Sequence, residues 1–320
     1  MLKISAPGKL MLFGEHAVVY ERPCIVVAID HRMEVSLGKR EDNKINLNAP
    51  EMNFKDYLVS LDDLEKPHPK EVRFVLTAIK NFFEVYNLES GLEVETKSQF
   101  SAKFGLGSSS AVTVSTIKGL SELFRIKISQ KELFNLAHKT VLDIQGVGSG
   151  FDLAAAVYGG TLFFLTGGKV IEQIKVKNLP IVIGYTGVKA DTVTLVKMVA
   201  EKLAKEPERI NKVFNEIEKV VKLTRGEIEN SDWRKVGELM NLNQNLLREL
   251  GVSSKELESL IKAALKGGAY GAKLSGAGGG DCMIAIAEKE DRDKVKEMIK
   301  RAGGEITKAK VDSQGVRVEK

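Results

Sequence analysis

The sequence is poor in cysteine, and it contains no long apolar run. Its two cysteines, Cys24 and Cys282, each lie in an apolar stretch. They predict buried thiols in a reducing compartment and argue against a disulfide framework or a zinc site. No stretch approaches the roughly 20 apolar residues that span a membrane, and the N-terminus lacks the apolar region of a signal peptide. We therefore expect a cytoplasmic protein with no membrane partner.

Dense blocks of positive charge are also missing. The formal net charge is +5 over 320 residues, and lysine is scattered among glutamate and aspartate. Aromatic residues make up 6%, whereas a nucleic-acid-binding face needs clustered cations, often with aromatics between them. We therefore expect no nucleic-acid partner. A mildly positive field does suit an anionic small molecule, such as a nucleotide or a phosphate ester.

The chain is long enough for two domains. Apolar alternation predicts short strands at 2–5 and 10–13 and a strand over 305–318, whereas helical spacing predicts a helix over 109–125. Long amphipathic helices are expected between 192 and 266. Strands and helices mix without strict βαβ alternation, which favours an α+β fold over a doubly wound sheet. We expect a domain boundary near 165–180.

The central motif runs from Lys103 to Ala111 and reads Lys-Phe-Gly-Leu-Gly-Ser-Ser-Ser-Ala. Gly105 and Gly107 permit backbone conformations that a Cβ would forbid, and a helix begins directly after them. The free N–H groups and dipole at a helix N-terminus form a ready anion site. Ser108 could cap this helix, contact a phosphate or bind Mg²⁺. An ordinary serine-capped helix after a turn is the alternative interpretation.

A second motif carries four glycines in five positions, at 276–280. Such a run exposes consecutive N–H groups and lets a ligand or another backbone approach closely. Close strand packing is the alternative interpretation.

Two further segments carry charged groups beside glycine. Lys9 follows Ala-Pro-Gly, and a lysine on a tight turn can reach a phosphate; a plain surface lysine is the alternative. His16 follows Gly14 and Glu15 and is either a substrate contact or a polar group between strands. Asp152 follows a glycine-rich loop, where it could cap a helix or place a carboxylate near the reacting oxygen.

Together these motifs resemble the GHMP kinase superfamily, in the expected order and over nearly the whole chain. The resemblance implies a two-domain α+β fold, with a ribosomal-S5-like N-terminal domain over 1–170 and a ferredoxin-like C-terminal domain over 171–320. It also implies ATP and Mg²⁺ as cofactors, with ATP bound in the N-terminal domain and its phosphates on the central loop. We expect a monomer or a homodimer.

The resemblance assigns roles to individual residues. Lys9 and Asp152 are the expected catalytic pair, and Ser108 the expected Mg²⁺ ligand. The expected nucleotide-binding residues are Lys103, Gly105, Leu106, Gly107, Ser108, Ser109, Ser110 and Ala111. The expected substrate-binding residues are Glu15, His16, Lys103, Gly276, Ala277, Gly278 and Gly279.

The acceptor is the point on which the motifs conflict. The segment around Glu15 and His16 resembles mevalonate kinases, whereas Asp281 and the Lys-Phe-Gly entry to the central loop resemble phosphomevalonate kinases. Val141 occupies the position where mevalonate kinases carry a Mg²⁺-binding glutamate, and Asp143 lies two residues further on. A phosphorylated acceptor needs positive charge more than a base, and Lys103 supplies one. We therefore expect phosphomevalonate as the acceptor, with mevalonate as the alternative.

Two other classes remain as alternatives. A non-catalytic metabolite-binding protein of the same fold should lack the lysine or the aspartate of the pair, and this chain has both. A nucleic-acid-binding protein should show a clustered basic face, which the sequence does not predict.

Overall fold

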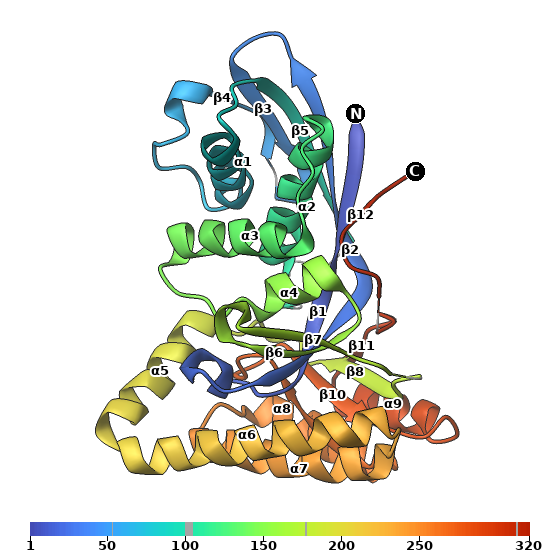
Figure 1. Cartoon of the computed structure of the whole chain (residues 1–320). Helices are drawn as coiled ribbons and strands as arrows, with labels where there is room; N and C mark the ends of the chain where they lie inside the picture. The colour runs from blue at the N-terminus through green and yellow to red at the C-terminus, as the bar shows by residue number, and fades with distance from the viewer. Residues whose placement is uncertain (53, 100–104, 177, 312) are drawn as a thin grey trace.

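The computed structural model describes residues 1–52, 54–99, 105–176, 178–311 and 313–320. Within these residues the strands form two separate sheets. The first has the order β12-β1-β2-β5-β3-β4, with β6 pairing with β2 and β7 pairing with β6. The second has the order β11-β8-β10-β9. Figure 1 shows the first sheet and its helices at the top and the second sheet with its long helices at the bottom.

The first part of the chain alternates irregularly between strands and helices. Its strands are β1 (Leu2–Phe13), β2 (Cys24–Arg40), β3 (Lys44–Ala49), β4 (Phe54–Ser60), β5 (Gly91–Ser98), β6 (Thr161–Leu165) and β7 (Val170–Ile174). Its helices are α1 (Arg73–Tyr86), α2 (Ser108–Leu123), α3 (Gln130–Gln145) and α4 (Phe151–Tyr158). The pairing is antiparallel except between β3 and β5, which run parallel.

The helices of the first part cover one face of its sheet, and their sequences explain where they begin and end. α2 packs against β1 and β2, and ten of its residues, including Val114 and Ile117, are buried. α3 starts with a capping box between Ser129 and Glu132 and ends at Gly146, which is left-handed. A serine cap of this kind stabilises a helix by about 1 kcal/mol.

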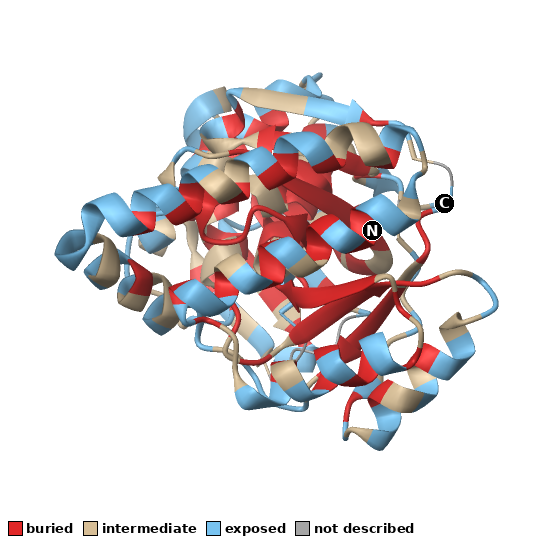
Figure 2. Ribbon diagram, turned by 90° about the horizontal axis from the view of Figure 1, so that it is seen from below, coloured by how far each residue is buried: buried red, intermediate tan, exposed pale blue. Residues whose placement is uncertain are grey.

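The second part of the chain is dominated by long amphipathic helices. Its strands are β8 (Ile181–Tyr185), β9 (Gly271–Ser275), β10 (Cys282–Ile286) and β11 (Glu305–Ile306). Its helices are α5 (Thr192–Lys205), α6 (Pro207–Glu229), α7 (Trp233–Leu250), α8 (Lys255–Lys266) and α9 (Arg292–Arg301). In Figure 2 the strands and the inward helix faces are buried, while the outward helix faces are exposed. None of the described helices is both long and apolar enough to cross a bilayer.

The chain crosses between the two sheets twice. It leaves β7 at Ile174 and enters β8 at Ile181, and after β11 it returns so that β12 (Arg317–Val318) pairs with β1. Arg32 holds this return, since its guanidinium donates hydrogen bonds of 2.8 Å to the carbonyl oxygens of Gln314 and Gly315. Arg32 is only 5% exposed. A buried guanidinium needs such acceptors, because an unpaired charge is costly to bury.

The α+β, two-part architecture expected from the sequence is confirmed. The division at 170 and 171 stays a prediction. Cys24 and Cys282 are both buried, as expected.

Three local predictions were wrong or incomplete. The two short strands at 2–5 and 10–13 form one strand, β1, whose register shifts between Pro7 and Gly8. The strand over 305–318 is wrong, because only 305–306 and 317–318 pair within described strands. The β3–β4 hairpin was missed.

Candidate active site

The central glycine loop ends in an open helix N-terminus. Gly107 is the N-cap of α2, with φ +85°, and no side chain caps the helix. The serine-capped alternative is therefore wrong for Ser108 and Ser109. The first-turn N–H groups of α2 and its dipole remain available for an anion. Ser108 is exposed at this end, while Ser110 and Ala111 turn into the buried interior.

Lys9, a residue of β1, contacts this loop. Its backbone N–H donates to the carbonyl oxygen of Leu106 at 2.9 Å, and its Nζ lies 3.3 Å from the carbonyl oxygen of Gly105. Lys9 is only 8% exposed, so it is not an ordinary surface lysine. A Cβ on Gly107 would lie 3.1 Å from the Lys9 side chain, which explains the need for glycine there. The Lys9 ammonium is thus held beside the anion site.

Asp152 lies in the first turn of α4, and the structure places it near Lys9. The N-cap is Gly150, so Asp152 does not cap the helix. The Lys9 Nζ is 5.2 Å from the ring centroid of the adjacent Phe151. Burial raises the pKa of the Asp152 carboxyl above its ordinary value, and the charge of Lys9 acts in the opposite direction. A carboxyl with a raised pKa beside a cation is suited to accept a proton.

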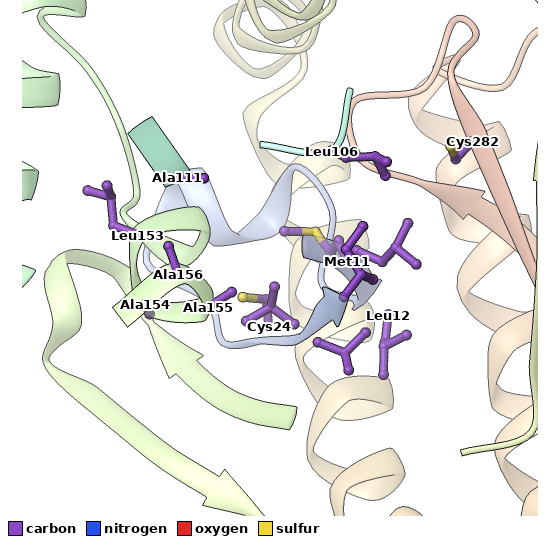
Figure 3. Packing of buried hydrophobic residues seen from close by; sticks show 14 of the residues in the cluster. Met11, Leu12, Cys24, Leu106, Ala111, Leu153, Ala154, Ala155, Ala156 and Cys282 are labelled. Atoms are coloured by element: carbon purple, nitrogen blue, oxygen red, sulfur yellow. The ribbon is translucent and has the colours of Figure 1, made fainter. Parts of the chain in front are cut away.

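Small and apolar side chains form the wall behind this pair. Figure 3 shows Met11 and Leu12 of β1, Leu106 of the loop and the alanines of α4 as parts of one buried cluster, which also contains Cys24. Burial and the nearby charges of Glu15 and Asp152 raise the pKa of the Cys24 thiol. Cys24 is therefore an uncharged part of the core.

A fully buried ion pair joins the segment after β1 to the second sheet. The Nζ of Lys273 in β9 donates to the Oε1 of Glu15, and both side chains are 0% exposed. Burial raises the pKa of Glu15 and lowers that of Lys273, and their mutual attraction opposes both shifts. The second oxygen of Glu15, Oε2, has no hydrogen-bond partner in the described part of the chain. Glu15 was predicted as a substrate residue, whereas Lys273 was missed.

His16 makes the second contact between the two parts. Its Nε2 lies 2.8 Å from the carbonyl oxygen of Ala277, so Nε2 carries the proton and donates it. Burial lowers the pKa of His16, which keeps the ring neutral and leaves Nδ1 as an acceptor. The β9–β10 glycine loop is thereby held against the residues that follow β1.

The glycines of this loop serve mainly close packing. A Cβ on Gly278 would lie 2.1 Å from the carbonyl oxygen of Val252, whereas one on Gly276 would meet nothing within 4 Å. Gly279 donates its N–H to the same carbonyl oxygen at 2.8 Å. The close-packing interpretation therefore explains 278 and 279, and Gly276 and Ala277 are the positions that face the first sheet.

Asp281 is a further site residue that sequence reasoning did not place. Its Oδ1 accepts a hydrogen bond of 3.1 Å from the N–H of Ala190. Its Oδ2 lies against Gly105, where an added Cβ would clash with it. Burial raises its pKa, and the charges of Lys9 and Lys189 lower it. Asp281 thus fixes the loop of the second part against the entry of the anion site. Lys103 lies outside the described residues.

Asp143 does not replace the missing metal-binding glutamate. Its carboxylate is bonded to Lys139 and Asn81, both at 2.8 Å, and Val141 is buried. The described residues contain no cluster of three acidic, histidine or cysteine side chains that could hold a metal.

Comparisons with known proteins agree with this architecture. Family models for the GHMP kinases N terminal domain and for GHMP kinases C terminal match residues 73–160 and 224–305. A mevalonate kinase of Thermococcus sibiricus is 37% identical and one of Pyrococcus abyssi 38% identical, each over 98% of this chain and 97% of the relative. The crystal structure of the Methanococcus jannaschii mevalonate kinase is 29% identical, with a TM-score of 0.80 over 99% of this chain and 98% of that one.

These relatives overturn the expected acceptor. Phosphomevalonate was favoured on Asp281 and Lys103, yet the relatives that are 37% and 38% identical over 98% of this chain are mevalonate kinases. Asp281 has a different explanation, since its carboxylate accepts a hydrogen bond from the N–H of Ala190, in the segment between β8 and α5. The agreement of the two family models, the near-full-length relatives and the site geometry supports one conclusion: the chain belongs to the GHMP kinase family.

Proposed function

We propose that the protein is a mevalonate kinase, which transfers the γ-phosphoryl group of ATP to the hydroxyl of mevalonate. The observation that carries the proposal is the placement of Lys9 and Asp152 beside the uncapped N-terminus of α2. An alcohol acceptor must lose a proton, and Asp152 is a carboxyl suited to take it. The near-full-length similarity to mevalonate kinases supports this acceptor.

The nucleotide phosphates would bind at the start of α2. The N–H groups of the turn from Gly105 to Ala111 and the helix dipole stabilise the negative charge of the triphosphate. The Lys9 ammonium adds a fixed positive charge on the same side. Phosphoryl transfer depends chiefly on such positioning and charge stabilisation. The assignment of ATP binding to 1–170 is part of this proposal.

Asp152 would accept the proton of the acceptor hydroxyl. The pKa of Asp152 is raised, so it lies closer to the pKa of the attacking alcohol than the pKa of an exposed aspartate does. Lys9 keeps the carboxylate charged at neutral pH. The two side chains therefore act as a pair, in which one removes a proton and the other stabilises the charge that develops.

The acceptor's polar groups would be held where the two parts of the chain meet. His16 offers its neutral Nδ1, and the Oε2 of Glu15 has no hydrogen-bond partner among the residues that the structure describes. Gly276 and Ala277 bring backbone groups to the same place, and Gly278 and Gly279 support them from behind.

The residues present fit a Mg²⁺ ion that is held mainly by the nucleotide. Mg²⁺ commonly keeps several waters and binds through one or two protein oxygens together with substrate phosphates. The exposed hydroxyl of Ser108 lies at the anion site and is suited to this role. When bound, the ion would neutralise charge on the phosphates.

The decisive measurement is ADP release with ATP and Mg²⁺, in parallel with mevalonate and with phosphomevalonate. We expect turnover with mevalonate only. Lys9→Ala should lower kcat by about 10²–10³-fold, and Asp152→Asn by about 10²–10⁴-fold. The matched control is Asp143→Asn, which removes an equivalent charge outside the site and should leave kcat within about twofold of wild type, the span allowed for a surface change of about 0.5 kcal/mol. Turnover with phosphomevalonate alone would refute the proposal.

A further inference from the structure

A groove lies away from the candidate active site, between α9 and the two connections that join the sheets. Its volume is about 1130 Å³. One side is formed by β8 and α9, which lie next to each other in Figure 1. The other side is formed by Val176, Asn178 and Leu179 of the outward connection and by residues 307–311 of the return connection. A molecule in this groove would therefore touch the second part of the chain and both crossings.

The groove is lined by cations. Those among the described residues are Lys289, Arg292, Lys296, Lys300, Lys308 and Lys310, and no carboxylate is among the described lining residues. Lys296 pairs with the exposed Asp293 at 2.8 Å. For Lys300 and Lys308 the described part of the chain provides no ion-pair partner. The positive charge of the groove is thus largely uncompensated.

The arrangement of these cations serves the stability of α9 only in part: Lys300 lies in the last turn, where the dipole favours a cation, and Lys296 pairs with Asp293. Arg292, Lys296 and Lys300 are spaced by four residues, so they lie along one face of the helix. Like charges at this spacing repel and weaken a helix. Arg292 is also the first residue of the helix, where the dipole disfavours a cation. An anion bound along this face would offset the repulsion among the three cations.

The floor of the groove is apolar. Ile181 and Ile306 are half-buried there, and Ile183 is buried. Ligand sites commonly combine an apolar surface with a few charged groups that orient the ligand. A purely inorganic anion would leave this floor in contact with water.

We propose that this groove binds an anionic amphiphile, a phosphate monoester with a hydrocarbon part, and that the bound molecule bridges the two parts of the chain. The phosphate pairs with the cations of α9 on one side and with Lys308 on the return connection. The hydrocarbon part covers Ile181 and Ile306. The site is separate from the proposed kinase site and does not depend on that assignment.

The test is calorimetric titration of the full-length protein with octyl phosphate, below its micellar concentration. We expect one saturable site, unaffected by saturating ATP. Lys300→Glu and Lys308→Glu, one on each side of the groove, should each weaken binding by about tenfold or more. The matched control is Lys294→Glu, on the same helix, which is exposed and does not line the groove. It should change the affinity by less than about twofold, as screened surface charges interact weakly.

Any of the following results would overturn the proposal. If Lys294→Glu weakens the binding of octyl phosphate as much as the groove variants do, the effect is one of diffuse charge. If only Lys300→Glu weakens binding, the ligand does not bridge the two sides of the groove. Each buried methylene should add affinity. If methyl phosphate binds as tightly as octyl phosphate, the hydrocarbon chain does not contact the apolar floor. If octyl phosphate shows no saturable binding, the groove binds no such ligand. The same conclusion follows if ATP displaces octyl phosphate and neither groove variant changes its affinity.

Discussion

The buried pair of Glu15 and Lys273 should be a major contributor to the stability of the contact between the two parts of the chain. Both side chains are 0% exposed, so solvent screening reduces their interaction little. At an effective dielectric constant of about 20, unit charges about 4 Å apart attract by about 4 kcal/mol. Removal of one partner leaves the other charge buried and unpaired. We predict that Glu15→Gln lowers the free energy of unfolding by about 3–5 kcal/mol.

The double variant separates the pair from simple loss of packing. Lys273→Met should also cost about 3–5 kcal/mol. Apolar replacement of both partners leaves no buried charge, so Glu15→Leu with Lys273→Met should recover most of the loss. With Glu15→Leu as the matching single variant, a double variant that is less destabilised than either single requires a coupling energy of about 3 kcal/mol or more.

The pH dependence of the single variants has a defined sign. Burial lowers the pKa of Lys273 below its ordinary 10.5, and loss of Glu15 removes the attraction that opposes this shift. Between the lowered value and 10.5 the unfolded chain binds more protons, so Glu15→Gln should regain stability as pH rises through that window. The pKa of Glu15 is raised above 4.5. Lys273→Met should therefore regain stability as pH falls through the raised value of Glu15 toward 4.5.

Urea denaturation provides the measurement. The single tryptophan, Trp233, reports on α7, and far-UV circular dichroism reports on the whole chain. The control is Lys219→Met, which breaks an exposed pair with Glu216 and should cost less than about 1 kcal/mol. If Glu15→Gln is no more destabilising than this control, or the coupling energy is below about 0.5 kcal/mol, the reasoning is refuted.

Three further predictions follow from the site. Because the pKa of Asp152 is raised above its ordinary 3.8, the acid limb of a kcat/KM profile against pH should lie above 3.8; a limb at or below that value would contradict a role as base. Cys24 and Cys282 are buried and burial raises the pKa of Cys282 to about 12, so Ellman's reagent should label neither thiol rapidly at pH 8 until the protein is unfolded; rapid labelling of the native protein would show that the core is open. Gly278→Ala should destabilise the protein more than Gly276→Ala, because both glycines have positive φ but only the first meets a carbonyl oxygen; equal melting temperatures would contradict the packing argument.

The parts of the site that depend on local backbone chemistry were predictable from the sequence. The sequence predicted a glycine turn followed directly by a helix, and Gly107 is the left-handed N-cap of α2. The amphipathic helices from 192 to 266 were predictable for the same reason, since their apolar spacing reports one buried face. Both properties depend on neighbouring residues only.

The acceptor and several contacts could not be obtained in this way. The choice of phosphomevalonate depended on single charged residues, and a charge in a sequence does not reveal its partner. Asp281 is satisfied by the N–H of Ala190 within the fold. The alternation over 305–318 suggested a strand, although most of that segment connects one sheet to the other.

By itself, the sequence determined the fold class and the glycine turn at the start of α2, and it singled out Lys9 and Asp152 as the proposed catalytic pair. Only the tertiary structure decided that Glu15 pairs with Lys273, 258 residues away, and that the cations of α9 face both crossings of the chain. The physical reason is the sequence distance over which each interaction acts. Helix ends and turns are set by adjacent residues, whereas burial, ion pairing and pKa values depend on which distant segments the two sheets bring together.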